Sequence, residues 1–340
     1  MTRILLTLIV LTLYPLTSLS DTSVFTAPFI AAENKIQPEY PRGDLYSGKE
    51  GWVLFNVVVD EEGTPREANI VDYSATQDMK KAARKALMKS KFTPGKLNGQ
   101  SIESTAYFRY SFSIEGGVGA SRSFRRLYKK FNKHLDKQNI QTAQETLSEL
   151  EEKTSLNNYE RAFINFSKFR LAFVKGEQKN QPLYLNRALG YESKGKDLNY
   201  LSEELRAIAR RQLFILQVEQ KHYADALSTY EEMNKNQQKE DIELFKDTYQ
   251  AIKTLKSDDQ TFSIREQLDD RGFLFHSLIK NSISIFDAQG ELNELRLRCQ
   301  KKYVYFDYSP NKQWNIPNEW GECTLQVIGE PKAEFTLWQG

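Results

Sequence analysis

The spacing of apolar residues changes twice along the chain of 340 residues, and this divides it into three zones. From Phe29 to Ile114, alternating apolar residues flank one stretch with helical spacing, and from Arg122 to about Ser257 helical spacing takes over. From Asp269 onward the alternation returns. Because each period suits only one kind of element, we predict a multidomain α+β fold. Its parts are a small α+β domain (29–115), an all-α domain (122–257) and a small all-β domain (269–340), with a glycine-rich linker at 116–121.

The first twenty residues have the three-part layout of a secretory signal peptide. Arg3 supplies a positive charge, the segment from Ile4 to Leu13 is mostly apolar, and small residues precede Asp21. The apolar core is shorter than the roughly 20 residues that a bilayer crossing needs. We therefore expect cleavage after residue 20 and a periplasmic protein. The alternative is an uncleaved anchor that holds the protein on the periplasmic side of the inner membrane.

The composition excludes several classes of function. With 47 basic and 45 acidic residues the net charge is +2, which argues against nucleic-acid binding. The two cysteines and the three histidines (His134, His222 and His276) lie far apart, so we expect no metal site. The chain has no phosphate-binding loop, nucleophile elbow or zinc-protease motif. We therefore expect a non-enzymatic protein with no catalytic residue and no cofactor.

The first zone reads as two strands, a helix and a third strand. A strand runs over 51–60 and returns over 67–72 after an acidic turn, and a helix is expected over 78–91. The third strand, Ser104 to Ile114, has two different faces. The apolar face carries Ala106, Phe108, Tyr110 and Phe112, and the polar face carries Thr105, Tyr107, Arg109, Ser111 and Ser113.

An ordered set of residues in this zone resembles the C-terminal domain of TonB. The set comprises Tyr40–Pro41, Gly51, alternating Val53, Phe55, Val57 and Val59, then Asp60, Gly63, Ile70–Val71, Ser74, Ala82–Ala83, Ala86–Leu87, Phe92 and Pro94. The resemblance implies a ββαβ domain that captures a short segment of an outer-membrane transporter by strand addition. It also implies a set of partner-binding residues, namely Thr105, Tyr107, Arg109 and Ser111 on the third strand and Tyr40 and Pro41 at the entry to the domain.

Roles other than partner binding remain open for these residues. Tyr40 and Pro41 could simply fix how the chain enters the first strand, and Arg109 could simply protect an edge strand from chance pairing. The chain also departs from the TonB pattern, because this domain comes first and no proline-rich spacer precedes it. The 17 residues from Asp21 to Gln37 contain one proline and span at most ~60 Å. We therefore expect an adaptor that does not transduce energy by itself.

The second zone resembles a tetratricopeptide repeat. Ala209, Leu213 and Leu216 line one helix, and Tyr223, Ala226 and Tyr230 line the next, with weaker copies around Ala143 and Ala188. Stacked helix pairs leave a groove that binds protein segments, and a non-repetitive bundle is the alternative. The basic helix at 122–133 is interpreted as a solvated face over a buried aromatic stripe, with contact to anionic lipid as the alternative.

The third zone is expected to hold five or six strands. Cys299 and Cys323 are 24 residues apart without a C-x-x-C motif, so in an exported protein we predict one structural disulfide. Trp314, Trp320 and Trp338 are expected to pack in the core, an aromatic binding surface being the alternative.

The sequence as a whole predicts a non-enzymatic periplasmic adaptor related to TonB systems. It would capture an extended segment by strand addition and bind a protein partner through helical repeats. The expected link is to outer-membrane transport. The expected partners are a TonB-dependent transporter or a TonB-system component, with no nucleic acid and with membrane contact only through an uncleaved N-terminus. The alternatives are a membrane-anchored energy-coupling accessory and a peptidoglycan-binding structural protein of the envelope.

Overall fold

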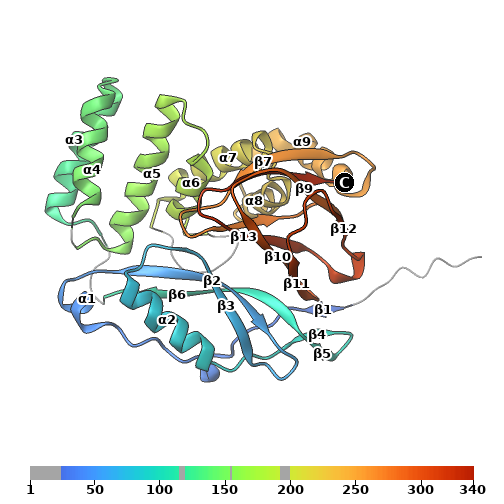
Figure 1. Cartoon of the computed structure of the whole chain (residues 1–340). Coiled ribbons are helices and arrows are strands. Elements are labelled where there is room, and N and C mark those ends of the chain that lie inside the picture. The colour runs from blue at the N-terminus through green and yellow to red at the C-terminus, as the bar shows by residue number, and fades with distance from the viewer. Residues whose placement is uncertain (1–23, 115–118, 154, 192–199) are drawn as a thin grey trace, which may run out of the picture.

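The computed structural model describes residues 24–114, 119–153, 155–191 and 200–340. The predicted signal peptide and residues 116–118 of the glycine-rich linker lie outside these residues. None of the helices within the described ranges is long and apolar enough to cross a membrane. The three predicted zones are present, and the helices and the C-terminal sheets both lie over the same side of the N-terminal sheet (Figure 1).

The N-terminal domain is built on an antiparallel sheet of three strands in the order β3-β2-β6. These strands span Gly51–Val59 (β2), Pro65–Tyr73 (β3) and Ser104–Phe112 (β6), and helix α2 covers Gln77–Lys89. Val53, Phe55 and Val57 of β2 pack with α2 residues such as Met79 and Leu87, as the alternation predicted. The smaller elements are β1 (Phe25–Thr26), η1 (Ala32–Asn34), α1 (Arg42–Tyr46), β4 (Gly95–Leu97) and β5 (Gln100–Ile102).

Strand β2 is buried along its whole length and on both faces. The face opposite α2 carries Trp52, Leu54 and Val58, each less than 5% exposed. Its sequence, GWVLFNVVV, is almost continuously apolar, which is typical of a strand covered on both sides. The sheet therefore requires a second covering layer, and the other two domains supply it.

The helical domain is a row of antiparallel helices in which each helix packs against the next one in sequence. Three consecutive apolar clusters run along the row. The tetratricopeptide assignment stays a prediction. The helices are α3 (Arg122–Asp136), α4 (Ile140–Glu151), α5 (Asn158–Lys175), α6 (Gln181–Ala188), α7 (Glu203–Glu219), α8 (Tyr223–Lys235) and α9 (Lys239–Ser257).

The C-terminal domain is a sandwich of two four-stranded antiparallel sheets, with strand orders β11-β10-β13-β8 and β12-β9-β14-β7. Strand β7 pairs with β14, so the sandwich begins before Asp269 and contains more strands than the five or six expected. Trp314 and Trp320 pack against its core. The strands are β7 (Phe262–Gln267), β8 (Phe273–Ser277), β9 (Ser282–Gln289), β10 (Leu292–Cys299), β11 (Tyr303–Asp307), β12 (Gln313–Asn315), β13 (Cys323–Gly329) and β14 (Glu334–Gln339), with η3 at Asn318–Trp320.

The predicted disulfide is confirmed. Cys299 and Cys323 face each other across the paired strands β10 and β13 and are bonded to each other. Both are buried in the sandwich core. The bond closes the segment that carries β11 and β12, and it lies where the sandwich meets the N-terminal domain.

Replacing both cysteines by serine should lower the free energy of unfolding by ~3 kcal/mol, because the unfolded chain is no longer cross-linked. Chemical denaturation without reductant measures the difference from wild type. Added dithiothreitol should bring wild type down to the stability of the double variant and leave the variant unchanged. Equal stability of the two proteins without reductant would contradict a stabilising role for the bond.

Candidate functional site: a cleft where three domains meet

The outer face of the N-terminal sheet is held to the sandwich by a buried arginine. The Arg298 side chain on β10 is inaccessible to solvent and donates to Glu67 Oε1 on β3 (2.7 Å), Asn56 Oδ1 on β2 (3.0 Å) and Gln326 Oε1 on β13 (2.8 Å). Arg296 also pairs with Glu67, and the Tyr303 hydroxyl donates to Glu67 Oε2 at 2.6 Å. This cluster of charged groups thus joins β2 and β3 of the N-terminal sheet to β10 and β13 of the sandwich.

A buried carboxylate, Asp72, ties the helical domain to the same face. Asp72 on β3 accepts hydrogen bonds from both Arg187 Nε (2.8 Å) and Nη2 (2.6 Å) and from the Tyr191 hydroxyl (2.6 Å). Tyr191 also packs edge-on against Trp52 with ring centroids 5.7 Å apart. The helices and the sandwich therefore dock side by side on one sheet.

The two edges of this sheet differ. At the β3 edge, Arg271 donates to the carbonyl oxygens of Ile70 (2.9 Å) and Val71 (3.0 Å), and Arg84 donates to the carbonyl of Ala68. These guanidinium groups occupy acceptors that a further strand would need. Strand β6 ends the sheet on the other side.

The polar face of β6, which is predicted to lie near an external partner, packs mostly against the other two domains. The Thr105 hydroxyl donates to the Cys299 carbonyl (3.0 Å), and the Tyr107 hydroxyl hydrogen-bonds Thr324 Oγ1 (3.3 Å). Arg109 donates to the Gly190 carbonyl and lies over the Trp52 ring. Of the four predicted partner-binding residues on β6, only Ser111 is exposed. The covering domains fold back over this face, and a strand pattern cannot reveal that.

The contacts of Tyr40 fit the structural alternative, in which it fixes how the chain enters the first strand. Its ring packs edge-on against Phe112, and its hydroxyl donates to the Lys49 carbonyl at 2.5 Å. Burial, together with the nearby Glu50 and Asp44, raises the pKa of Tyr40 to about 12, so it stays a neutral donor. Pro41 is the N-cap residue of α1. The pair fixes how the chain enters β2.

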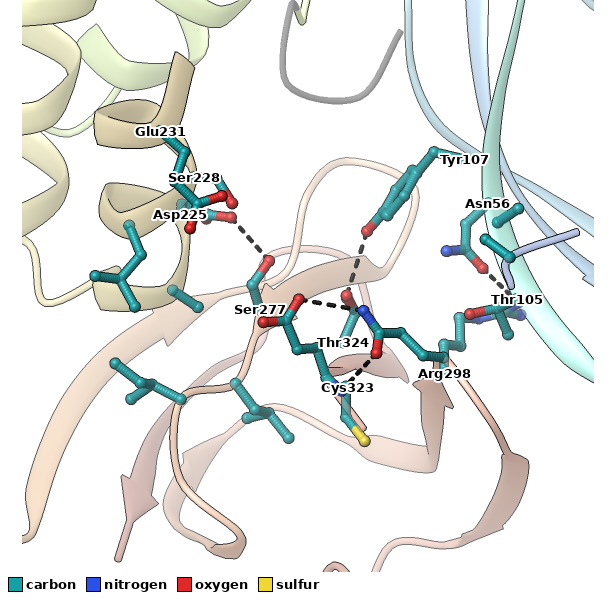
Figure 2. A pocket seen from close by; sticks show the side chains of 18 of the residues that line it. Asn56, Thr105, Tyr107, Asp225, Ser228, Glu231, Ser277, Arg298, Cys323 and Thr324 are labelled. Carbon is teal, nitrogen blue, oxygen red and sulfur yellow. Dashed lines mark hydrogen bonds between the residues drawn. The ribbon is translucent and has the colours of Figure 1, made fainter. Parts of the chain in front are cut away.

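A cleft of about 620 Å³ lies where the three domains meet (Figure 2). One wall comes from β6, and the opposite walls come from α8, α9 and the ends of β10 and β13. Thr105, Ala106 and Tyr107 all line it. Because neighbouring side chains of a strand point to opposite faces, a cavity bounded by all three must reach the outer edge of β6.

The charges around the cleft balance. Lys253 and Lys256 come from α9 and Arg298 from β10, while Asp225, Glu231 and Glu322 supply the same number of negative charges. Lys256 pairs with Glu322 at 3.5 Å, and Asp225 accepts from the Ser277 hydroxyl at 2.8 Å. The cleft therefore suits an uncharged polar ligand better than a strongly charged one.

Two histidines that the sequence separates meet beside the cleft. The ligand atoms of His222, Glu266 and His276 lie within 4.8 Å of one another, a spacing that could suit a metal ion. However, Gln339 Oε1 accepts from the backbone amides of Ile279 and Lys280, so its amide nitrogen donates to His276 Nε2 (2.9 Å).

His276 Nδ1 must then carry the proton that it shares with Glu266 Oε1 at 2.8 Å. Burial raises the pKa of Glu266, but the hydrogen bond from His276 and the electrostatic effects of His276 and His222 together keep that pKa below its ordinary value. These residues therefore fit a hydrogen-bonded link between α8 and the sandwich better than a metal site.

The comparisons with known proteins concern the domain that carries β6. Residues 36–114 match the family described as Gram-negative bacterial TonB protein C-terminal. This segment is a TonB-type C-terminal domain. The match ends two residues after β6, before the helical domain begins.

Two relatives of this domain illustrate the match. Protein TonB of Vibrio cholerae is 28% identical over 82 residues, which cover 24% of this chain and 34% of that protein. The chain thus spans about a third of the length of this relative. The solution structure of the Pseudomonas aeruginosa TonB C-terminal domain matches 29% of this chain and 94% of its own, at 22% identity and a TM-score of 0.23.

The contact between Glu67 and Arg298 should make the stability of the protein depend on pH. Burial raises the pKa of Glu67, but Arg298, Tyr303 and Arg296 together hold that pKa below its ordinary value. A lowered pKa in the folded state means that the charged form stabilises the fold above the unfolded-state pKa of about 4.3. This contribution is lost as the pH falls through the folded-state value.

Glu67→Gln should therefore be less stable than wild type at pH 7, and the gap should narrow between pH 5 and pH 3. Urea unfolding followed by tryptophan fluorescence measures both proteins. Glu62→Gln, in the exposed turn before β3, is the matched control and should follow wild type at every pH. A gap between Glu67→Gln and wild type that is constant with pH would show that the carboxylate charge does not hold the domains together.

Proposed function

We propose that this protein is a non-enzymatic adaptor of the bacterial envelope that captures an extended segment of a partner protein by strand addition to β6. The cleft along β6 is the observation that carries the proposal. Strand addition needs an edge strand and room beside it. The β3 edge is closed by Arg84 and Arg271, so β6 is the favoured edge.

The similarity to TonB supports the cell compartment and the class of partner. A TonB-type domain fits a protein of the periplasm, in agreement with the expected signal peptide. The captured segment would belong to a TonB-dependent outer-membrane transporter or to another component of a TonB system. The segment would meet side chains of α8, α9 and β13 as well as β6, so the added domains would make the site more selective.

The helical domain offers a separate surface for a second protein. Phe173 and Val174 of α5 and Ile208 of α7 are 59%, 49% and 46% exposed, and they border a shallow apolar groove. Large exposed apolar side chains that gather in one place favour a protein contact. This surface supports the adaptor role.

Photo-crosslinking in intact cells tests the cleft. Ser228 is exposed on the α8 wall, so a photoreactive benzoylphenylalanine at position 228 faces any captured segment. We expect it to capture one defined envelope protein through a contiguous extended segment. The same group at the exposed position 246 of α9, which lies outside the cleft, should not capture that protein. Identical products from both positions would overturn the proposal.

Backbone methylation of the captured segment tests the binding mode. In an added strand, alternate backbone amides donate to the neighbouring strand. Two synthetic copies of the segment are compared, one N-methylated at its odd-numbered residues and the other at its even-numbered residues. One copy should bind at least tenfold more weakly than the unmethylated segment, and the other should bind equally well. Isothermal titration against the full chain measures this. Equal loss in both registers would contradict strand addition.

A further inference from the structure

Asn56 on β2 places a hydrogen-bond donor at the inner end of the cleft. The residue is 1% exposed and lines the cleft. Its Oδ1 accepts from Arg298 Nη1 at 3.0 Å, and because a guanidinium only donates, this contact fixes which end of the amide is oxygen. Figure 2 shows the amide nitrogen turned toward the open centre of the cleft. The hydrogen bonds among the described residues include none that this nitrogen donates.

A buried amide donor is nearly always matched by an acceptor in folded proteins. The amide nitrogen of Asn56 faces the cleft, so a ligand bound there can supply the matching oxygen. Tyr107 is the register partner of Asn56, so Asn56 lies one strand inward from the sheet edge. Neighbouring strands are ~4.8 Å apart. A strand added to β6 would therefore run roughly 10 Å from β2, too far for its backbone to reach Asn56.

A side chain of the added strand can cover this distance. It would pass over β6 between Thr105 and Tyr107, which lie on the same face as Asn56. The side chain must be long and must end in an oxygen, and glutamine and glutamate meet both conditions. Asparagine and aspartate are one carbon shorter.

The charges near Asn56 favour the neutral amide over the carboxylate. Arg298, the nearest cation, is already paired with Glu67 at 2.7 Å. A further carboxylate would be buried without a counter-charge of its own, which is costly. The amide nitrogen of a glutamine would instead meet the Thr324 hydroxyl, which borders the same part of the cleft.

We propose that Asn56 recognises a glutamine side chain of the segment captured on β6 by donating a hydrogen bond to it. The cleft is then a sequence-selective subsite. This inference rests on the proposed strand addition. The selectivity for a glutamine side chain would arise at the junction of the three domains, and β6 alone would not have it. Arg298 and Thr324 of the sandwich form the subsite around Asn56.

The test uses three nine-residue peptides of alternating threonine and valine that differ only at the central residue, which is glutamine, leucine or lysine. Fluorescence anisotropy measures their binding to the full chain. Wild type should bind the glutamine peptide about fivefold more tightly than the leucine peptide, the effect of one neutral hydrogen bond, and the lysine peptide least. Asn56→Asp keeps the oxygen that Arg298 uses and replaces the donor by an acceptor. This variant should bind the lysine peptide most tightly.

Asn69→Asp is the matched control. Asn69 faces the same interface, donates to Glu67 and to Gln326 Oε1 (3.1 Å), and does not line the cleft. This variant should lose stability but keep the wild-type order of peptides. If the peptides bind equally to wild type, or Asn56→Asp keeps the wild-type order, the glutamine subsite is wrong while strand addition stands. If no peptide binds at millimolar concentration, strand addition fails and the subsite with it.

Discussion

The buried guanidinium of Arg298 is the contact on which the arrangement of the domains depends. A charge taken out of water is tolerated only where an opposite charge and hydrogen-bond acceptors surround it. Glu67 supplies the charge, and Asn56 and Gln326 supply further acceptors, from three different strands. The two sheets can satisfy all of these bonds only in one relative position, so the cluster sets how the sandwich docks. Asp72 with Arg187 and Tyr191 does the same for the helices.

This docking changes what a TonB-type domain can offer to a partner. One face of its sheet is covered by α2 and the other by the helices and the sandwich, so neither face is open. The β3 edge is closed by arginines. What is left for recognition is the β6 edge and the cleft beside it, whose other walls come from outside the TonB-type domain. The proposed capture of a segment on β6 would therefore depend on how the domains assemble.

Much of the fold could be predicted from local patterns. Alternation placed β2, β3 and β6, and helical spacing placed α2 and the helical row. The two cysteines, in a chain expected to be exported, implied the disulfide. The predictions were weaker where elements are short or irregular. Strand β12 has only three residues, and β7 precedes the expected domain boundary, so the sequence patterns predicted neither strand. The continuous apolar run of β2 is typical of a strand buried on both faces, but it does not indicate which segments cover it.

The sequence by itself determined the order and type of the domains, the TonB-type segment and the disulfide, because each depends on neighbouring residues or on residue type. Only the tertiary structure decided that Thr105, Tyr107 and Arg109 contact the other domains, that His222 and His276 meet at Glu266, and that Asn56 ends a cleft. These groupings join residues far apart in the sequence, such as Asn56 and Arg298, which are 242 positions apart. Such contacts arise from the burial of one domain against another, and no local periodicity records which faces will meet.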